Sequence, residues 1–352
     1  AEHFGLRPLV RFGTEVLSVK PVPGAESSPR WRVSSRSDAG TSTEDFDAVV
    51  VAKGHYDEPY LPEIPGQAAW LAADSGRRSV VHSREYDDPQ AYAGKVVLVV
   101  GGRSSAVDIA RELRGAAQAV YVLEKGCQEV YAEGSCVHVP MGSELRADGR
   151  LQLGDQVIAG PPVDSIILAT GYVYSFPFLD AKELGLEFGP ARRFVEPLWM
   201  HAVHARFSTL SFVGVPLAVP CPVPTFEAQS RFIAAHLRRE LAPLEEREAW
   251  VAARRLAIGD RTQDWHFLGS EAWTYIRELT RMSGMDGEEY EAFDNRLTVV
   301  SQVYQDRVSK RPTLPWGDDW FRRCNYTVDW ERGTWEVEAP PEAAGGDGGA
   351  GA

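Results

Sequence analysis

The feature that most constrains this chain is the segment 95–125, which has the pattern of a buried strand, a glycine turn, a helix and a second buried strand. Val96–Val100 is an unbroken apolar run, as expected for a parallel strand that is buried on both faces. Gly101 and Gly102 then give a tight turn, and Ala119–Leu123 is the second apolar run. This order predicts the βαβ unit of a dinucleotide-binding fold.

The expected helix begins directly after the turn. Ser104 and Ser105 stand at its start, and Asp108 follows Ser105 at the spacing of a capping box. Apolar residues at helical spacing give the helix one face that packs on the strand: Ala106, Ile109, Ala110 and Leu113. Free N–H groups and the positive end of the helix dipole would point at a pyrophosphate over the turn.

Two details of this pattern leave alternatives open. Arg103 stands where the usual pattern has a glycine, so one alternative is a βαβ unit that binds nothing; the other is an arginine that donates two hydrogen bonds to phosphate. Glu124 and Lys125 end the second strand, where the ribose 2′ position would lie. An acid there favours a free 2′-hydroxyl and a cation favours a 2′-phosphate, and we favour NADP through Lys125.

Composition excludes several classes of protein. The net charge of −13 argues against nucleic acid or an anionic membrane as the main partner. No apolar run approaches the roughly 20 residues of a membrane span. The cysteines have neither CxxC nor zinc-site spacing, so we expect reduced, inert thiols, a cytoplasmic protein and no metal. His201 and His204 lie three residues apart but lack further ligands at metal-site spacing.

The rest of the chain predicts a mixed α/β protein that is long enough for two domains. A loop is expected at Pro21–Pro29 and a disordered tail at 339–352, and the tryptophans, such as Trp316 and Trp320, are expected to serve packing. Strands are predicted at 9–12, 15–19, 31–34, 45–52, 150–153, 156–159, 164–169 and 210–213, and helices at 226–241 and 244–256.

Two of these strands end alike. The sequence VVVAKGHY at 49–56 and the sequence IILATGY at 166–172 each run from an apolar strand into a glycine and then a histidine or an aromatic residue. Gly54 and Gly171 would let the backbone pass close to a nucleotide at the carboxyl edge of a sheet. The alternative is two unrelated buried strands that end in glycine turns.

Seven segments in order resemble the flavin-containing monooxygenases, and among them most closely the plant and algal S-oxygenating branch. They are AKGHY, PEIPG, HSREY, VGGRSSAVDIARE, DSIILATGYVYSFPFLD, VEPLWMHAVHARFSTLSFVGVP and FEAQSRFIAAHL, and the resemblance runs from about Phe4 to Met285. It implies an α/β, two-dinucleotide-binding-domain flavoprotein, with a Rossmann-like NADPH domain inserted in a discontinuous FAD domain. We therefore expect FAD-domain parts at 1–56 and 164–338, and the inserted NADPH domain at 57–163.

The chain departs from the family pattern at several positions. The family's N-terminal GxGxxG for FAD is absent, so we expect a piece of a longer protein that lacks its front. Of the fingerprint FxGxxxHxxxY, His82 and Tyr86 remain, while Arg78 stands in place of the glycine. Lys53 replaces the family's Thr or Ser. These departures keep a truncated, non-catalytic NADP-binding remnant as an alternative.

The resemblance implies a monooxygenase that uses FAD and NADPH to insert one oxygen atom of O2 into a sulfide or an amine, through a C4a-hydroperoxide of the flavin. The cofactor supplies this chemistry, so no catalytic side chain is nominated. A pyridine-nucleotide disulfide reductase is the competing enzyme class, but it needs a redox dithiol beside the flavin. The nearest cysteines, Cys127 and Cys136, are nine residues apart. A Baeyer–Villiger oxygenase would typically have a tryptophan at Tyr86.

The resemblance also assigns cofactor contacts, residue by residue. The NADP pyrophosphate would be held by Gly101, Ser104 and Ser105, with Arg103 and Lys125 as cationic contacts. The turns between the two nucleotides would be formed by Thr170 and Gly171 and by Gly54 and His55. His82 is a further candidate, with a purely structural histidine as the alternative, and Gln229 would lie near the flavin pyrimidine. The oligomeric state is not predicted.

Overall fold

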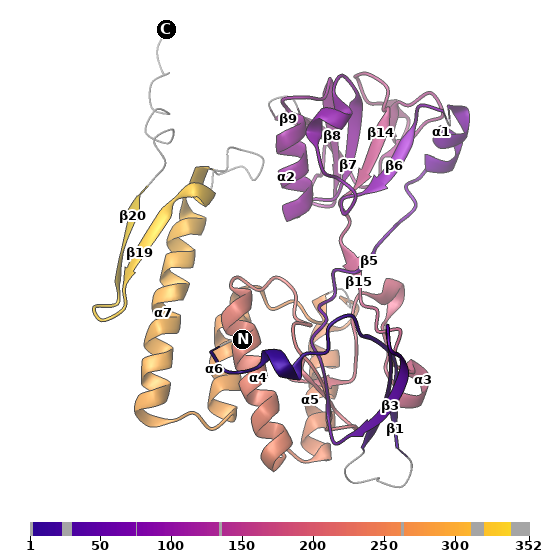
Figure 1. The fold of residues 1–352 in the computed structure, drawn as a ribbon. Helices are drawn as coiled ribbons and strands as arrows, with labels where there is room; N and C mark the ends of the chain where they lie inside the picture. Colours follow the sequence, from indigo (N-terminus) through magenta and orange to yellow (C-terminus); the bar gives the residue numbers. More distant parts are fainter. Residues whose placement is uncertain are drawn as a thin grey trace. The chain divides into compact units, whose positions relative to one another are not determined.

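The computed structural model describes residues 3–22, 30–74, 76–133, 136–261, 264–310 and 320–338. It is mixed α/β and divides into two compact units (Figure 1). Unit 1 comprises Ala1–Glu58 and Val173–Ser301, and unit 2 comprises Pro59–Tyr172 and Gln302–Ala352. The chain passes between them through β5 (Glu58–Pro59) and β15 (Tyr172–Val173), which pair with each other.

Unit 2 is built on a six-stranded sheet with the order β6-β14-β7-β8-β10-β9 (Figure 1). Every neighbouring pair is parallel except β9 and β10. The strand order reverses between β7 and β14, and the carboxyl ends of the five parallel strands share one edge. The strands are β6 (Ser79–His82), β7 (Val96–Val100), β8 (Ala119–Glu124), β9 (Tyr131–Glu133), β10 (Cys136–Pro140) and β14 (Ser165–Leu168).

The core of unit 2 follows from the apolar runs of its sequence. All five residues of β7 are buried, and α2 (Ser104–Leu113) packs its apolar face on the sheet. The other face of the sheet is covered by α1 (Gln67–Ala73), in which Trp70 donates from Nε1 to the Val163 carbonyl at 3.1 Å. A smaller sheet consists of β11 (Glu144–Leu145), β12 (Leu151–Leu153) and β13 (Gln156–Val157), and η2 (Pro89–Tyr92) precedes β7.

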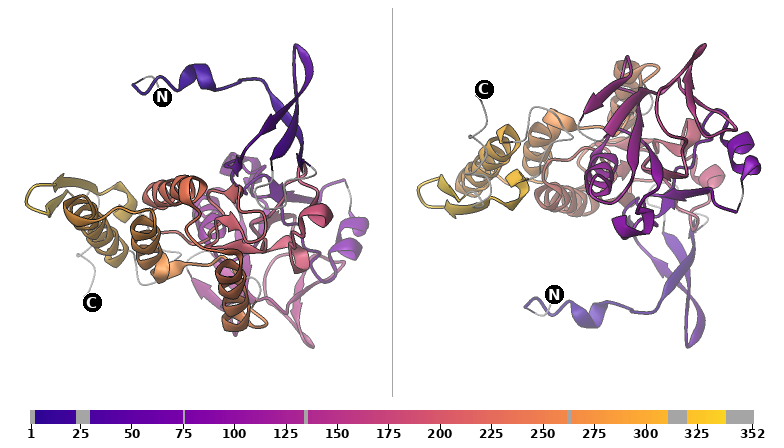
Figure 2. Two further views of the ribbon diagram at one scale, coloured as in Figure 1. Left: turned by 90° about the horizontal axis from the view of Figure 1, so that it is seen from below. Right: turned by 90° about the horizontal axis from the view of Figure 1, so that it is seen from above.

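Unit 1 combines two sheets with a group of helices. The first sheet has the order β16-β17-β18-β4, in which β18 (Leu210–Phe212) runs parallel to β4 (Val49–Val51). The second sheet is antiparallel, and Figure 2 shows it as an indigo ribbon of strands. The remaining strands are β16 (Leu198–Trp199), β17 (Val203–His204), β1 (Glu15–Pro21), β2 (Trp31–Ser37) and β3 (Gly40–Phe46).

The helices of unit 1 bury their apolar faces in a common core. α4 and α6 pack together through residues such as Phe232, Ile276 and Leu279. The helices are α3 (Ala181–Leu184), α4 (Pro222–Arg239), α5 (Leu244–Ile258) and α6 (Ala272–Met282), with η1 (Arg7–Leu9), η3 (Pro190–Arg192) and η5 (Gly269–Glu271). α7 (Gly287–Ser309) runs past the unit boundary and is followed by η6 (Trp320–Arg323), β19 (Asn325–Asp329) and β20 (Thr334–Glu338).

The structure corrects several local predictions. The predicted strand at 9–12 is wrong, because η1 ends at Leu9 and the residues that follow it are irregular and exposed. The capping box at Ser105 is also wrong: α2 begins at Ser104 with Arg103 as N-cap, and the Asp108 carboxylate accepts instead from Arg111 at 3.1 Å. The predicted strand at 45–52 is divided between β3, which ends at Phe46, and β4.

The unit boundary also differs from the predicted domain boundary at residue 163. β14 lies between β6 and β7 in the sheet of unit 2, so the chain leaves that unit only after Tyr172. Several predictions fall outside the described residues. They concern most of the loop at Pro21–Pro29, the tail at 339–352, Trp316 and the side chain of Trp320. Among the described helices, none has the length and apolar character needed to cross a membrane.

We predict that the stability of unit 2 depends on the buried face of β7. Leu98 is fully buried, so Leu98→Ala leaves a cavity and should lower the free energy of unfolding of unit 2 by about 2–5 kcal/mol. Leu61 belongs to the same unit but is 64% exposed, so Leu61→Ala is the matched control and should change it by less than about 0.5 kcal/mol. Urea unfolding followed by amide hydrogen exchange measures both values, and equal effects would contradict this core assignment.

Candidate functional site

The residues predicted to contact a nucleotide in unit 2 come together at the carboxyl edge of its sheet. His82 ends β6, Gly101 follows β7, and Glu124 ends β8. Thr170 lies two residues beyond the end of β14. Because the strand order reverses between β7 and β14, this edge is the position at which doubly wound sheets bind nucleotides.

The glycine turn after β7 is constrained by its neighbours. Gly101 has a φ of 135°, and a Cβ added there would lie 2.3 Å from the Ala169 carbonyl oxygen. Gly102 faces the side chain of Glu124, whose Oε2 would lie 2.6 Å from an added Cβ. Arg103 has an ordinary extended φ of −106°, so a side chain is tolerated at this position. Glycine is therefore required by the backbone at position 101 and by the neighbouring Glu124 side chain at position 102.

The start of α2 is open to a ligand. Ser104 and Ser105 are exposed, and the first intrahelical hydrogen bond is donated by the Val107 N–H to the Arg103 carbonyl at 3.0 Å. The backbone N–H groups before Val107 therefore have no partner within the helix. Together with the helix dipole they suit an anionic group above the turn.

His82 acts on the turn at the end of β14. Its Nε2 lies 3.0 Å from the Gly171 carbonyl oxygen, and its Nδ1 accepts from the Arg84 N–H at 3.1 Å. Burial is the main cause that lowers the pKa of His82, which fits a neutral ring that donates from Nε2. Gly171, with a φ of 79°, accepts a second hydrogen bond from the Tyr60 N–H at 2.9 Å. His82 therefore holds the backbone of this turn.

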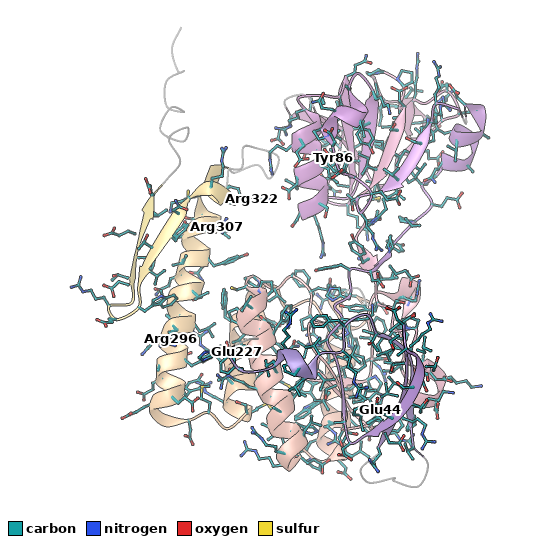
Figure 3. The ribbon with its side chains drawn as sticks, in the orientation of Figure 1. Glu44, Tyr86, Glu227, Arg296, Arg307 and Arg322 are labelled. Atoms are coloured by element: carbon teal, nitrogen blue, oxygen red, sulfur yellow. The ribbon has the colours of Figure 1, made fainter. Side chains whose placement is uncertain are left out.

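Two further side chains fix the segments around this edge. The Thr170 hydroxyl donates to the Tyr60 carbonyl at 2.5 Å, so it is engaged by backbone. Tyr86, labelled in Figure 3, donates from its hydroxyl to Glu112 of α2 at 3.0 Å, and burial is the main cause that raises its pKa. Both side chains therefore position the chain around the edge, and a contact of Thr170 with a cofactor stays a prediction.

Sequence reasoning missed His138. This residue lies in β10, is fully buried, and has Nδ1 2.8 Å from Oε1 of Glu124. The strand Cys136–Pro140 carries one polar residue in an apolar run, which was the available signal. The pairing itself depends on the parallel register that places His138 opposite Val122, two residues before Glu124. Lys125 is exposed just beyond the strand.

In unit 1, the turn after β4 borders a cavity of about 460 Å³, lined by Lys53, Gly54, His55, Tyr56 and Asp57. Gly54 has a φ of 75°. Both ring nitrogens of His55 are buried without a hydrogen bond of normal geometry to the described residues. Burial lowers the pKa of His55, against a smaller opposing effect of the Gly214 backbone. Buried polar atoms that lack a hydrogen bond of normal geometry and lie beside a cavity fit a site for a polar ligand.

Gln229 is fully buried and its amide is used within unit 1. Its Oε1 accepts from the Gly214 N–H at 2.9 Å, and its Nε2 donates to the Tyr275 hydroxyl at 2.9 Å. The Tyr275 hydroxyl in turn donates to the Met200 carbonyl at 2.8 Å. These bonds connect α4 and α6 to the loops beside β16 and β18, and a contact of Gln229 with flavin stays a prediction.

Three other histidines of unit 1 have protein partners. His201 and His266 approach through their Nδ1 atoms at 3.0 Å, while Nε2 of His204 lies 3.0 Å from the Leu184 carbonyl oxygen. Across the described part of the chain, no group of three His, Cys, Asp or Glu residues could hold a metal ion.

All four cysteines are free thiols. Burial is the main cause that raises the pKa of three of them, Cys127, Cys136 and Cys221. A raised pKa disfavours the reactive thiolate, so these three thiols do not have the character that a redox dithiol requires.

Comparison with known proteins agrees with this arrangement. Residues 1–135 match the family model of flavin-binding monooxygenase-like proteins. The chain is 36% identical over 288 residues to flavin-containing monooxygenase FMO GS-OX-like 6 of Arabidopsis thaliana, covering 79% of this chain and 58% of that protein. It is 34% identical over 337 residues to FMO GS-OX4 of the same plant, covering 91% of this chain and 68% of that protein.

Among solved structures, the S-allyl-L-cysteine S-oxygenase from Allium sativum superposes with a TM-score of 0.73 at 29% identity. The match covers 92% of this chain and 72% of that one. The fold is thus that of a flavoprotein monooxygenase with two dinucleotide-binding domains, as the sequence predicted. The chain belongs to the flavin-containing monooxygenase family, which confirms the predicted resemblance.

We predict that Gly101 is required by both the turn and the site. Gly101→Ala places a Cβ against the Ala169 carbonyl in a left-handed backbone, which should destabilise unit 2 by about 1–3 kcal/mol and weaken binding of adenine dinucleotides. Gly126→Ala is the matched control, because a Cβ there meets nothing within 4 Å. Thermal unfolding and calorimetric titration measure the two effects. An alanine at 101 that behaves like the control would contradict the described turn.

We predict that His204 makes unit 1 sensitive to acid. Burial is the main cause that lowers its pKa to about 4 from the ordinary 6.5, so the unfolded chain takes up a proton at a higher pH than the folded chain. The stability that a neutral His204 contributes is complete above pH 6.5 and is lost as the pH falls towards 4. The loss should reach about 1.4 kcal/mol per pH unit in this window.

Urea unfolding between pH 7 and pH 4, followed by tryptophan fluorescence, measures the slope of stability against pH. His204→Gln should reduce that slope, whereas His3→Gln, at an exposed position, is the control and should not change it. An unchanged slope in His204→Gln would contradict a neutral His204 in the folded protein.

Proposed function

We propose that this chain carries the nicotinamide-nucleotide site and part of the flavin site of a monooxygenase that uses FAD and a reduced nicotinamide dinucleotide. Its substrate is a soft nucleophile, a sulfide or an amine. The observation that supports this most strongly is the carboxyl edge of the unit 2 sheet, where Gly101 and the start of α2 meet the turn at Gly171. The sequence favours NADPH through Lys125, and the choice between NADPH and NADH depends on the end of β8.

In this proposal, unit 2 binds the dinucleotide by its pyrophosphate. The exposed N–H groups of Ser104 and Ser105 donate to the phosphate oxygens, and Arg103 adds a charge-assisted contact. The turn Thr170–Gly171 lies on the nicotinamide side, where His82 and Tyr60 keep its backbone in place. These residues bind and orient the nucleotide, and none of them exchanges a proton with the substrate.

In unit 1, the turn after β4 would contact the flavin. Gly54 lets the backbone approach, and the buried nitrogens of His55 offer a hydrogen-bond donor and an acceptor beside the cavity. The chemistry supplied by bound FAD is the activation of O2 with electrons from the nicotinamide. The protein's part is to position the nucleotides and to keep water away from the reacting atoms.

We infer a thioether as the preferred substrate class. The Allium relative is named as an S-allyl-L-cysteine S-oxygenase, at 29% identity over most of this chain. The balanced reaction consumes one O2, one reduced nicotinamide dinucleotide and one proton, and yields the sulfoxide, water and the oxidised dinucleotide. The sulfur loses two electrons and gains one of the two oxygen atoms.

We predict that His55 serves a ligand rather than the fold. His55→Phe keeps an aromatic ring but removes two buried nitrogens that lack a hydrogen bond of normal geometry, so the apo chain should be as stable as the wild type or more stable, by up to about 1–3 kcal/mol. The fraction of the chain that still holds FAD after gel filtration should fall by roughly tenfold. Leu256→Ala, at an exposed position on α5, is the control and should change neither value. A strong loss of apo stability in His55→Phe would contradict this role.

The proposed function is tested with the purified chain, FAD, a reduced nicotinamide dinucleotide and methyl phenyl sulfide. We expect retained flavin absorbance that bleaches without oxygen, and sulfoxide that carries one atom of isotopically labelled O2. Nucleotide binding without retained flavin would instead indicate a non-catalytic nucleotide-binding chain. Reduction of an added disulfide in place of sulfoxide formation would indicate the reductase class.

A further inference from the structure

The end of β8 places a carboxylate directly against the glycine turn. The Gly101 N–H donates to the carbonyl of Leu123 at 2.9 Å, which joins the turn to the last residues of β8. The next residue, Glu124, lies so close to Gly102 that its Oε2 would be 2.6 Å from an added Cβ. In a βαβ unit, this strand end is where the adenosine ribose of a bound dinucleotide lies.

The carboxylate of Glu124 is held in place by a residue of the neighbouring strand β10. Its Oε1 lies 2.8 Å from Nδ1 of His138, which is fully buried in β10, and the Glu124 side chain is only 12% exposed. The ring of Tyr131 stacks on His138, with ring centroids 4.5 Å apart and an angle of 3° between the planes. The two residues face each other across the pairing of β9 and β10. The position of the carboxylate is therefore set by the sheet.

The two cationic residues near this strand end are not fixed at the ribose position as Glu124 is. Lys125 follows the last residue of β8 and is exposed, so its charge is on a flexible, hydrated chain and is screened by solvent. Arg103 is the N-cap of α2, so its backbone lies beside the proposed pyrophosphate position. The fixed charge at the ribose position is thus negative, although the sequence alone shows an acid and a base side by side.

We infer that Glu124 determines which dinucleotide this chain binds. A fixed carboxylate accepts a hydrogen bond from a free ribose 2′-hydroxyl, and it repels the two negative charges of a 2′-phosphate. The site therefore prefers the nucleotide without the 2′-phosphate, NADH, and His138 is the positioning residue that orients Glu124. This inference rests on the proposed nucleotide site of unit 2 and reverses the preference that Lys125 suggested.

Calorimetric titration of the full chain with NAD⁺ and with NADP⁺ tests the inference without any turnover. We expect the wild type to bind NAD⁺ at least about tenfold more tightly than NADP⁺. Glu124→Gln keeps the shape and an acceptor for His138 but removes the charge, so it should narrow that ratio by roughly tenfold, mainly by strengthening NADP⁺ binding. Glu144→Gln removes the same charge from an exposed position on β11 and should leave the ratio unchanged.

A second variant distinguishes the contribution of Lys125 to nucleotide preference from that of Glu124. Lys125→Ala should leave the ratio within about twofold of the wild type, because an exposed and screened cation contributes little. Three results would each overturn the inference while leaving the nucleotide site in place. The wild type could bind NADP⁺ more tightly than NAD⁺, or Glu124→Gln could leave the ratio of the two affinities unchanged. The third result is a tenfold loss of NADP⁺ affinity in Lys125→Ala. Binding of neither nucleotide would overturn the site itself, and the inference with it. Thermal unfolding of each variant verifies that it is folded.

Discussion

The site in unit 2 depends on the parallel pairing of its sheet. Parallel strands bring their carboxyl ends to one edge, and this edge receives His82 from β6, Gly101 from β7, Glu124 from β8 and the turn at Gly171 from β14. These residues are separated by up to 89 positions in sequence, as in the contact of His82 with Gly171. The buried strands cost conformational entropy that their apolar residues offset, and the polar groups at the edge are positioned by that packing.

Most polar side chains near the candidate sites bind the protein's own backbone. His82, Thr170 and Gln229 each use their polar atoms to hold a neighbouring segment. Such residues would act on a ligand through the backbone that they position. His55 differs, because its buried nitrogens make no normal hydrogen bond and border a cavity. Glu124 differs as well, because its carboxylate is fixed against the glycine turn, where we propose that it recognises the ribose.

Local pattern was sufficient to predict the central elements of unit 2. β7 and α2 follow from one apolar run and one helical period, and both lie where the sequence placed them. What the sequence could not show was contact between distant segments: His138 reaches Glu124 only because β10 pairs with β8, and Gly102 is required only because Glu124 lies against it. The strand predicted at 9–12 failed for the opposite reason, since an apolar run becomes a strand only where another strand pairs with it. The domain roles and the individual cofactor contacts remain predictions.

We propose that the carboxyl edge of the unit 2 sheet is a nicotinamide-dinucleotide site. Amide hydrogen exchange of the chain, with and without a saturating concentration of NAD⁺, tests it most directly, because it locates the bound nucleotide without requiring flavin or turnover. We expect slower exchange at the start of α2 and at the turn around Gly171, with little change in α5 or in strands β1 to β3. Binding of the nucleotide without protection at the start of α2, or with protection confined to unit 1, would contradict it.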